Sequence, residues 1–234
     1  MLIFKEDVIR ETFEELFGGR IICLAACGSI VNGRSSAISD LDLLLVLDTY
    51  QPNDLSLGRQ AVQSLHNYSV DLSLQYANEL PIMPEDFQDG SKTSLALTYI
   101  SSAHVIAGTN IFRDMFQRLP KKSLQRSIIK TLEEYLHQMY ALAFKSSDTD
   151  EVFKTAALKY LTRSIVDTML YYEPSDMAPY KGLTKLEILE RSKQYPQLRH
   201  ITSHIGIDTS PLEMIQAMRA IVLQLKKGFG IMRQ

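Results

Sequence analysis

The stretch that decides the fold runs from Ala26 to Asp48 and reads ACGSIVNGRSSAISDLDLLLVLD. A short apolar run of strand type precedes it at residues 20–26 (RIICLAA). The sequence LDLLLVL at residues 41–47 is almost continuously apolar, which is typical of a strand that is buried on both faces. We therefore expect two strands, joined by a glycine-containing turn at which a short helix begins.

Gly28 and Ser29 directly follow the first of these strands. Glycine lets the backbone approach a ligand closely. The free N–H groups at the start of a helix, together with the Ser29 hydroxyl, form a site suited to phosphate. The sequence therefore predicts a phosphate-binding turn at Gly28 and Ser29.

Three aspartates near these strands form a candidate metal site. Asp40 and Asp42 share one face of the second strand, about 6.6 Å apart, because side chains alternate along a strand. Two carboxylates beside a phosphate site repel one another unless a cation lies between them, and such oxygen ligands suit Mg²⁺. Asp71 lies on the polar face of the alternating segment 69–76 (SVDLSLQY) and would complete a two-metal site. Asp48 is the alternative third ligand.

The remaining patterns divide the chain into a mixed first half and a helical second half. We expect helices at residues 5–17, 54–66 and 91–101, a loop at 81–90 and a last strand at 104–107. A boundary near Leu119-Pro120 separates the expected domains, 1–118 and 119–234. Beyond it, capping boxes and apolar stripes with helical spacing indicate a helical bundle. The capping boxes are Asp148-x-x-Glu151, Thr184-x-x-Glu187 and Ser210-Pro211-x-Glu213.

Composition excludes several classes of protein. There are 25 Lys and Arg residues against 27 Asp and Glu, a formal charge of −2, and a duplex DNA binder usually has a basic excess. Nothing approaches about 18 consecutive apolar residues, so we expect no membrane span. Cys23 and Cys27 are expected to be buried reduced thiols, which favours a cytoplasmic protein.

The motif around the aspartates is similar to one in a known superfamily. Gly28-Ser29, Gly33 and Ser39-Asp40-Leu41-Asp42 match the pattern G-S-x(n)-G-x(n)-[S/T]-D-h-D-h, where h is hydrophobic. In this respect residues 1 to 118 resemble the DNA polymerase β-like nucleotidyltransferases, most closely the minimal and aminoglycoside nucleotidyltransferases of bacteria. The helical remainder resembles the accessory domain of such proteins only in type.

The resemblance implies an α+β fold, in which a nucleotidyltransferase domain with a small mixed sheet flanked by helices precedes a C-terminal helical bundle. It implies that Asp40 and Asp42 hold two Mg²⁺ ions, that Asp71 holds the catalytic ion, and that Gly28 and Ser29 bind the triphosphate. The implied reaction transfers a nucleoside monophosphate, AMP from ATP, to a hydroxyl and releases pyrophosphate. The acceptor stays open between a small molecule, a protein and an RNA.

Two other functions stay open. The same fold could sense a nucleotide, or neutralise a partner toxin, without turnover. Arg199-x4-His204 resembles the signature of the helical HEPN ribonucleases. Several further residues are candidates for phosphate contact, for the acceptor's base or for an RNA-binding run, although each also fits an ordinary surface position. They are Arg34, Lys159, Arg163, Lys181 and Lys185 for phosphate, Glu79, Glu85 and Asp86 for the base, and Arg118, Lys121, Lys122, Arg126 and Lys130 for RNA.

Overall fold

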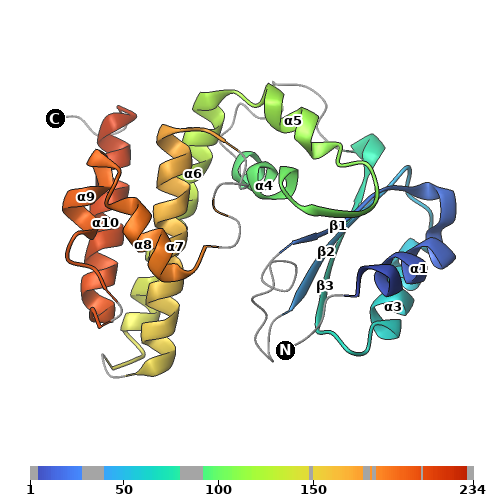
Figure 1. The fold of residues 1–234 in the computed structure, drawn as a ribbon, viewed down its shortest axis with the longest axis horizontal. Coiled ribbons are helices and arrows are strands. Elements are labelled where there is room, and N and C mark those ends of the chain that lie inside the picture. Colours follow the sequence, from blue (N-terminus) through green and yellow to red (C-terminus); the bar gives the residue numbers. More distant parts are fainter. Residues whose placement is uncertain are drawn as a thin grey trace. The chain divides into compact units, whose positions relative to one another are not determined.

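The computed structural model describes residues 5–27, 40–79, 92–147, 150–175, 180, 183–206 and 208–230, with the side chains of 92–96 left aside. A four-stranded sheet forms the centre of the first half (Figure 1). Its strands are β1 (Ile21–Cys27), β2 (Leu41–Leu47), β3 (Val70–Tyr76) and β4 (His104–Gly108), in the spatial order β3-β2-β1-β4. β1 is antiparallel to β2 and β4, whereas β2 and β3 are parallel. The sheet is therefore mixed.

The helices and 3-10 turns of the first half lie before, between and after these strands. They are α1 (Glu6–Phe17), the 3-10 turn η1 (Gly18–Arg20), α3 (Asp54–Ser64), the 3-10 turn η2 (Ala77–Glu79), α4 (Lys92–Ser101) and α5 (Phe112–Arg118). The helix expected at residues 54–66 ends at Ser64, because Leu65 leaves the helical conformation. The turn expected to follow Gly28 and the loop expected at 81–90 lie outside the described residues.

One face of the sheet packs on α1 and α3. Ile9, Phe13 and Phe17 occur at helical spacing along α1 and are almost fully buried. They join Leu43 and Leu45 of β2 in one hydrophobic core. Burying such side chains stabilises a fold by about 1.5–3 kcal/mol each. This core fixes the orientation of β2, because alternate residues must then point away from α1 and α3.

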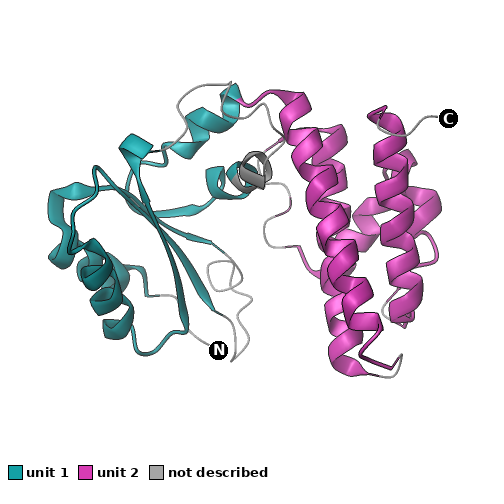
Figure 2. Cartoon of the chain, turned by 180° about the vertical axis from the view of Figure 1, so that it is seen from behind, with its two compact units in different colours: residues 1–86, 97–118 teal, residues 87–96, 119–234 magenta. Residues whose placement is uncertain are grey.

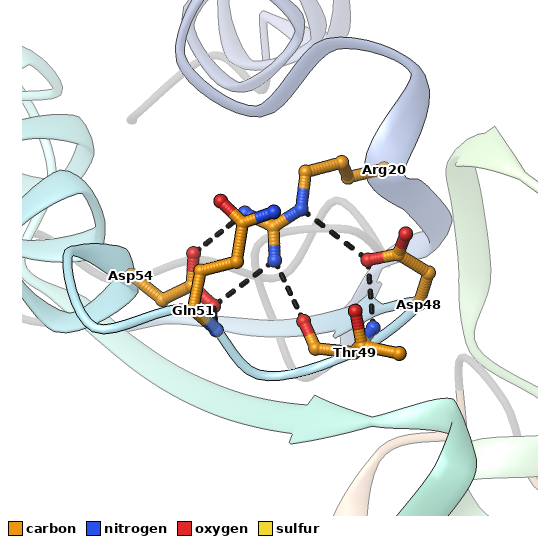
Figure 3. Close-up of polar contacts among 5 residues, drawn as sticks. All are labelled: Arg20, Asp48, Thr49, Gln51 and Asp54. Carbon is orange, nitrogen blue, oxygen red and sulfur yellow. Dashed lines mark hydrogen bonds and ion pairs between the residues drawn. The ribbon is translucent and has the colours of Figure 1, made fainter.

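A buried ion pair attaches the start of β1 to the start of α3 (Figure 3). Arg20 donates from Nη1 to Oδ1 of Asp54 over 2.7 Å, and the Asp54 side chain is fully buried. Arg20 also pairs with Asp48 at 3.3 Å and donates to the carbonyl of Thr49 at 2.7 Å. The backbone N–H of Gln51 donates to Asp54. The Arg20 guanidinium, Gln51 and Tyr76 thus hold the pKa of Asp54 below its usual value.

The second half consists of helices, as predicted. They are α6 (Lys121–Ala143), α7 (Glu151–Tyr172), α8 (Lys185–Ser192), α9 (Pro196–Thr202) and α10 (Pro211–Gly228). Reciprocal capping boxes begin α8 at Thr184 and α10 at Ser210, which confirms both predictions. The prediction for Asp148 is wrong, because Asp150 caps α7 by accepting from the N–H groups of Val152 and Phe153. An aspartate directly before the first helical residue reaches those donors best.

The predicted apolar stripes form the core of this bundle. Every member of the α7 stripe, from Phe153 to Met169 in steps of four, is buried. The stripe of α6 is also buried except for Tyr135, which is partly exposed. α6, α7 and α10 pack on one another. The predicted fold class, a mixed sheet flanked by helices and followed by a helical bundle, is confirmed.

The chain divides into two compact units (Figure 2). Unit 1 contains residues 1–86 and 97–118, and unit 2 contains residues 87–96 and 119–234. Among the described helices, none is both long enough and apolar enough to cross a membrane.

Candidate active site

Asp42 and Asp71 lie directly opposite one another on the two parallel strands β2 and β3. Neighbouring strands are about 4.8 Å apart, and residues in register point to the same face, so the two carboxylates are close neighbours. Both side chains are exposed. Asp42 is the one exposed residue of β2, whose other six residues are buried. The structure thus brings together two residues that are 29 positions apart in the sequence.

The orientation of this pair follows from the hydrophobic core. Leu41 and Leu43 point into the core with α1 and α3, so Asp42 between them must point to the opposite face. Val70 and Leu72 pack against the same core on either side of Asp71. The apolar alternation of both strands therefore forces the two carboxylates onto one face.

Asp40 lies two residues before Asp42, just outside β2, and is exposed. The N–H of Leu41 donates to the carbonyl of Ser69 over 2.7 Å, which holds this end of β2 beside the start of β3. Asp40 is therefore attached at the same end of the strand pair as Asp42 and Asp71. Gly28 and Ser29, the predicted phosphate-binding residues, lie outside the described part of the chain.

The donor chemistry of the register pair suits Mg²⁺. Like charges directly opposite one another destabilise a sheet, and a bound cation removes that cost. Within the described ranges, no three His, Cys, Asp or Glu side chains are grouped closely enough to hold a metal ion by themselves. Mg²⁺ commonly binds through one or two carboxylates and takes its other oxygens from water and substrate phosphates. Asp42 and Asp71 fit that kind of site, with Asp40 beside them.

Asp48 cannot take the place of Asp71. It directly follows Leu47, at the opposite end of β2 from Asp42. Its Oδ1 pairs with Arg20 and accepts from the N–H of Thr49 over 2.7 Å (Figure 3). Asp48 lies six positions after Asp42, which is about 20 Å along a strand. The role of Asp48 is therefore to hold the β2–α3 connection.

A thiol stands in the same row as the two carboxylates. Cys27 of β1 lies opposite Asp42 of β2, so the row across the sheet is Cys27, Asp42, Asp71. Cys27, which the sequence predicts to be buried, is partly exposed, whereas Cys23 is buried. Burial, followed by the proximity of Cys27, raises the pKa of Cys23 to about 11, so Cys23 is an unreactive thiol. The strand register that places Cys27 here has no signal in the sequence.

The other candidate residues are distributed over both units. Lys159 of α7 lies near Lys185, since burial and then the Lys159 charge lower the pKa of Lys185. Arg163 of α7 lies close to Tyr135 of α6, whose pKa burial raises to about 12. Glu79 is exposed in η2. Arg34, Glu85, Asp86 and Lys181 lie outside the described residues.

The Arg199 and His204 pair is divided by the end of a helix. α9 ends at Thr202, so Arg199 is helical and His204 is not. Arg199 donates from Nε to the carbonyl of Lys193 over 2.9 Å, which closes the turn between α8 and α9. The two residues of the motif are therefore not on one helix, which gives the ribonuclease alternative no structural support.

Among known proteins, a solved structure has a fold similar to that of this chain. No protein-family model matches the chain, and no curated protein matches it. A solved structure that is similar is the crystal structure of spectinomycin adenyltransferase AAD(9) from Enterococcus faecialis with ATP and spectinomycin. The similarity covers 96% of this chain and 100% of that one, with a TM-score of 0.55 and 13% sequence identity. The chain thus shares its fold with this adenyltransferase, as the resemblance to the nucleotidyltransferases implied.

Proposed function

We propose that this protein is a nucleotidyltransferase that transfers a nucleoside monophosphate, AMP from ATP, to the hydroxyl of an acceptor and releases pyrophosphate. The observation that carries the proposal is the register pair of Asp42 and Asp71 on parallel strands, which Asp40 precedes by two residues in the chain. The fold shared with a structure that contains ATP supports the same donor. The acceptor is a small molecule, a protein or an RNA, and the expected compartment is the cytoplasm.

The proposed role of each residue rests on the resemblance to the nucleotidyltransferases. Asp40 and Asp42 would hold the ion that accompanies the nucleotide, and Asp42 with Asp71 would hold the ion nearest the acceptor hydroxyl. Bound Mg²⁺ supplies charge neutralisation on the phosphates and a lower pKa at that hydroxyl. Gly28 and Ser29 would bind the triphosphate through backbone N–H groups and a hydroxyl. The base that takes the acceptor's proton stays open among Glu79, Glu85 and Asp86.

A module that only senses nucleotides, or only neutralises a partner, has less support. Such a protein has no need of two carboxylates opposite one another on neighbouring strands, whereas a two-metal transferase does. Both Asp42 and Asp71 are also exposed, so neither contributes to the core. The arrangement favours turnover over simple binding.

Asp42 of β2 and Asp71 of β3 have different expected roles in binding the two ions. The variant Asp71→Asn tests this difference. We expect Mg·ATP binding to stay close to that of the unaltered protein, because Asp40 and Asp42 would hold the nucleotide's ion. Transfer should fall by orders of magnitude, because the acceptor hydroxyl loses the ion next to it. Calorimetric titration of ATP and turnover on the same variant measure the two effects.

Ser73→Ala is the matched control, since Ser73 is exposed on the same face of β3. It should change neither binding nor turnover. Undiminished turnover in Asp71→Asn would refute the role of Asp71 as a metal ligand.

The acceptor can be found with labelled nucleotides. The protein and Mg²⁺ are incubated in host lysate with each α-labelled nucleoside triphosphate in turn, and the label is followed into protein, RNA and small-molecule fractions. We expect label from ATP in one fraction, and none when Asp42→Asn is used. Label from none of the four nucleotides would favour the module without turnover.

A further inference from the structure

The edge strand β3 has a sequence that can pair with a second copy of itself. β3 is one of the two outer strands of the described sheet (Figure 1). Its sequence, VDLSLQY, is close to symmetrical about Ser73. An antiparallel pair of two such strands, centred on Ser73, would set leucine against leucine and a carboxylate against an amide. The opposed residues are Leu72 with Leu74, Asp71 with Gln75, and Val70 with Tyr76.

The backbone of β3 has the hydrogen-bonding groups that this pairing needs. The carbonyl of Ser69 accepts from Leu41 of β2, so the backbone groups of Ser69 point toward β2. Backbone direction alternates along a strand, and therefore Val70, Leu72, Leu74 and Tyr76 direct their N–H and C=O groups to the open edge. In the symmetrical pair, Leu72 and Leu74 would exchange both hydrogen bonds, and Ser73 would form the close pair without hydrogen bonds.

Among the described strands, β3 lacks several of the features that usually protect an edge, although Asp71 gives it one charge. Native edges carry lysine or proline, or a bulge that disrupts the ladder. β3 contains neither Lys nor Pro, and its register with β2 continues without a shift over all seven pairs. The opposite edge differs, because β4 has only five residues and ends at Gly108 with φ of +73°. β3 is therefore the edge that is suited to pairing.

An apolar groove lies beside this edge. It has a volume of about 320 Å³ between α3 and β3, and its walls include Leu55, Val62, Leu72 and Leu74. Leu55 is 60% exposed, so part of the groove wall is open to solvent. A pair of strands alone buries much less than the roughly 1,600 Å² of a typical stable interface. A two-fold axis at Ser73 would bring both copies of the groove against the strand pair and add apolar area.

From these observations we propose that the chain forms a two-fold homodimer in which the β3 strands pair antiparallel about Ser73 and join the two sheets into one. The pairing sets Gln75 of the partner subunit opposite Asp71, on the side away from Asp42. Each candidate active site is then bordered by a side chain of the other copy. The inference concerns assembly, so it stands or fails independently of the proposed reaction.

A cysteine placed on the axis tests the register. In Ser73→Cys the two thiols would face one another in a pair with Cα atoms about 4.5 Å apart, within the range for a disulfide. We expect mild oxidation to convert most of this variant to a covalent dimer that a reductant reverses. Ser69→Cys is the matched control, because the two copies of residue 69 would be about 27 Å apart in this register. It should stay monomeric on a non-reducing gel, as should the unaltered chain with Cys23 and Cys27.

Sedimentation of the full chain over a range of concentrations provides the second measurement. We expect a monomer–dimer equilibrium that Ser73→Lys shifts several-fold toward the monomer, because like charges would meet on the axis. Ser69→Lys, at another exposed position of the same segment, should not shift it. A chain that is monomeric at every concentration would overturn the proposal. So would a failure of Ser73→Cys to cross-link, or equal cross-linking by Ser69→Cys.

Discussion

At the scale of the residue, the two aspartates near opposite ends of β2 have different expected roles. Asp42 faces Asp71 at one end of the strand, and Asp48 pairs with Arg20 just beyond the other end. We expect Asp42→Asn to abolish transfer with little change in stability, because the carboxylate is exposed and the amide keeps its shape. Asp48→Asn, the matched control, should keep activity. Turnover and far-UV circular dichroism of both variants check this, and more than a few per cent activity in Asp42→Asn would contradict the site.

The buried ion pair of Arg20 and Asp54 should make the stability of the protein depend on pH. The pKa of Asp54 is lower in the folded state than in the unfolded chain, where it is about 3.9. The ionised carboxylate therefore stabilises the folded state fully above the unfolded pKa. This stabilisation is lost as pH falls through the lower pKa of the folded state. Asp54→Asn should lower the free energy of unfolding at pH 7 by about 3 kcal/mol. The difference in free energy of unfolding between Asp54→Asn and the unaltered protein should become smaller below about pH 4, because Asp54 is then increasingly protonated.

Urea unfolding at pH 7 and pH 3 measures both effects. Asp48→Asn again serves as the control, since Asp48 is a more exposed partner of the same arginine. This substitution should lower the free energy of unfolding by less than about 1 kcal/mol. An equal loss in both variants, or a loss that does not depend on pH, would contradict the assignment.

At the scale of the element, β4 depends on one glycine. Gly108 has φ of +73°, and a Cβ there would collide with the backbone carbonyl of Ile22 in β1. Gly108→Ala should therefore disrupt the end of the β1–β4 ladder and lower the melting temperature by several degrees. Gly19→Ala, where a Cβ meets nothing within 4 Å, should be nearly neutral. Thermal unfolding followed by circular dichroism compares the two, and equal melting temperatures would show that Gly108 tolerates a side chain.

At the scale of the whole molecule, we expect the proposed ions to be needed for transfer but not for folding. The core of unit 1 is built from buried apolar side chains, and Asp40, Asp42 and Asp71 lie outside it. A chelator should therefore abolish transfer without changing the melting temperature. Mg·ATP should raise the free energy of unfolding by about 2.7 kcal/mol at one hundred times its dissociation constant. Thermal unfolding with Mg²⁺, ATP, both or neither tests this, and unfolding by the chelator alone would point to a structural metal instead.

Much of the molecule was predictable because the controlling interactions are local. The apolar run at residues 41–47 and the alternation at 69–76 are strand patterns, and their structure as β2 and β3 confirms them. Thr184 and Ser210 lie three residues from their capping partners. Asp148 was the wrong choice because Asp150 is an equally good capping residue two positions closer to the helix.

Only the tertiary structure decided which distant residues meet. The sequence by itself determined the elements, their apolar faces and the candidate carboxylates, since these depend on periods of two and about 3.6 residues. The pairing of Asp42 with Asp71 depends on the register between β2 and β3, and the row that includes Cys27 depends on the register with β1. The ion pair between Arg20 and Asp48 joins residues that are 28 positions apart in the sequence. It fixes Asp48 at the β2–α3 connection, away from the candidate site. Register and ion pairs join segments that are far apart in the chain, so no local pattern specifies them.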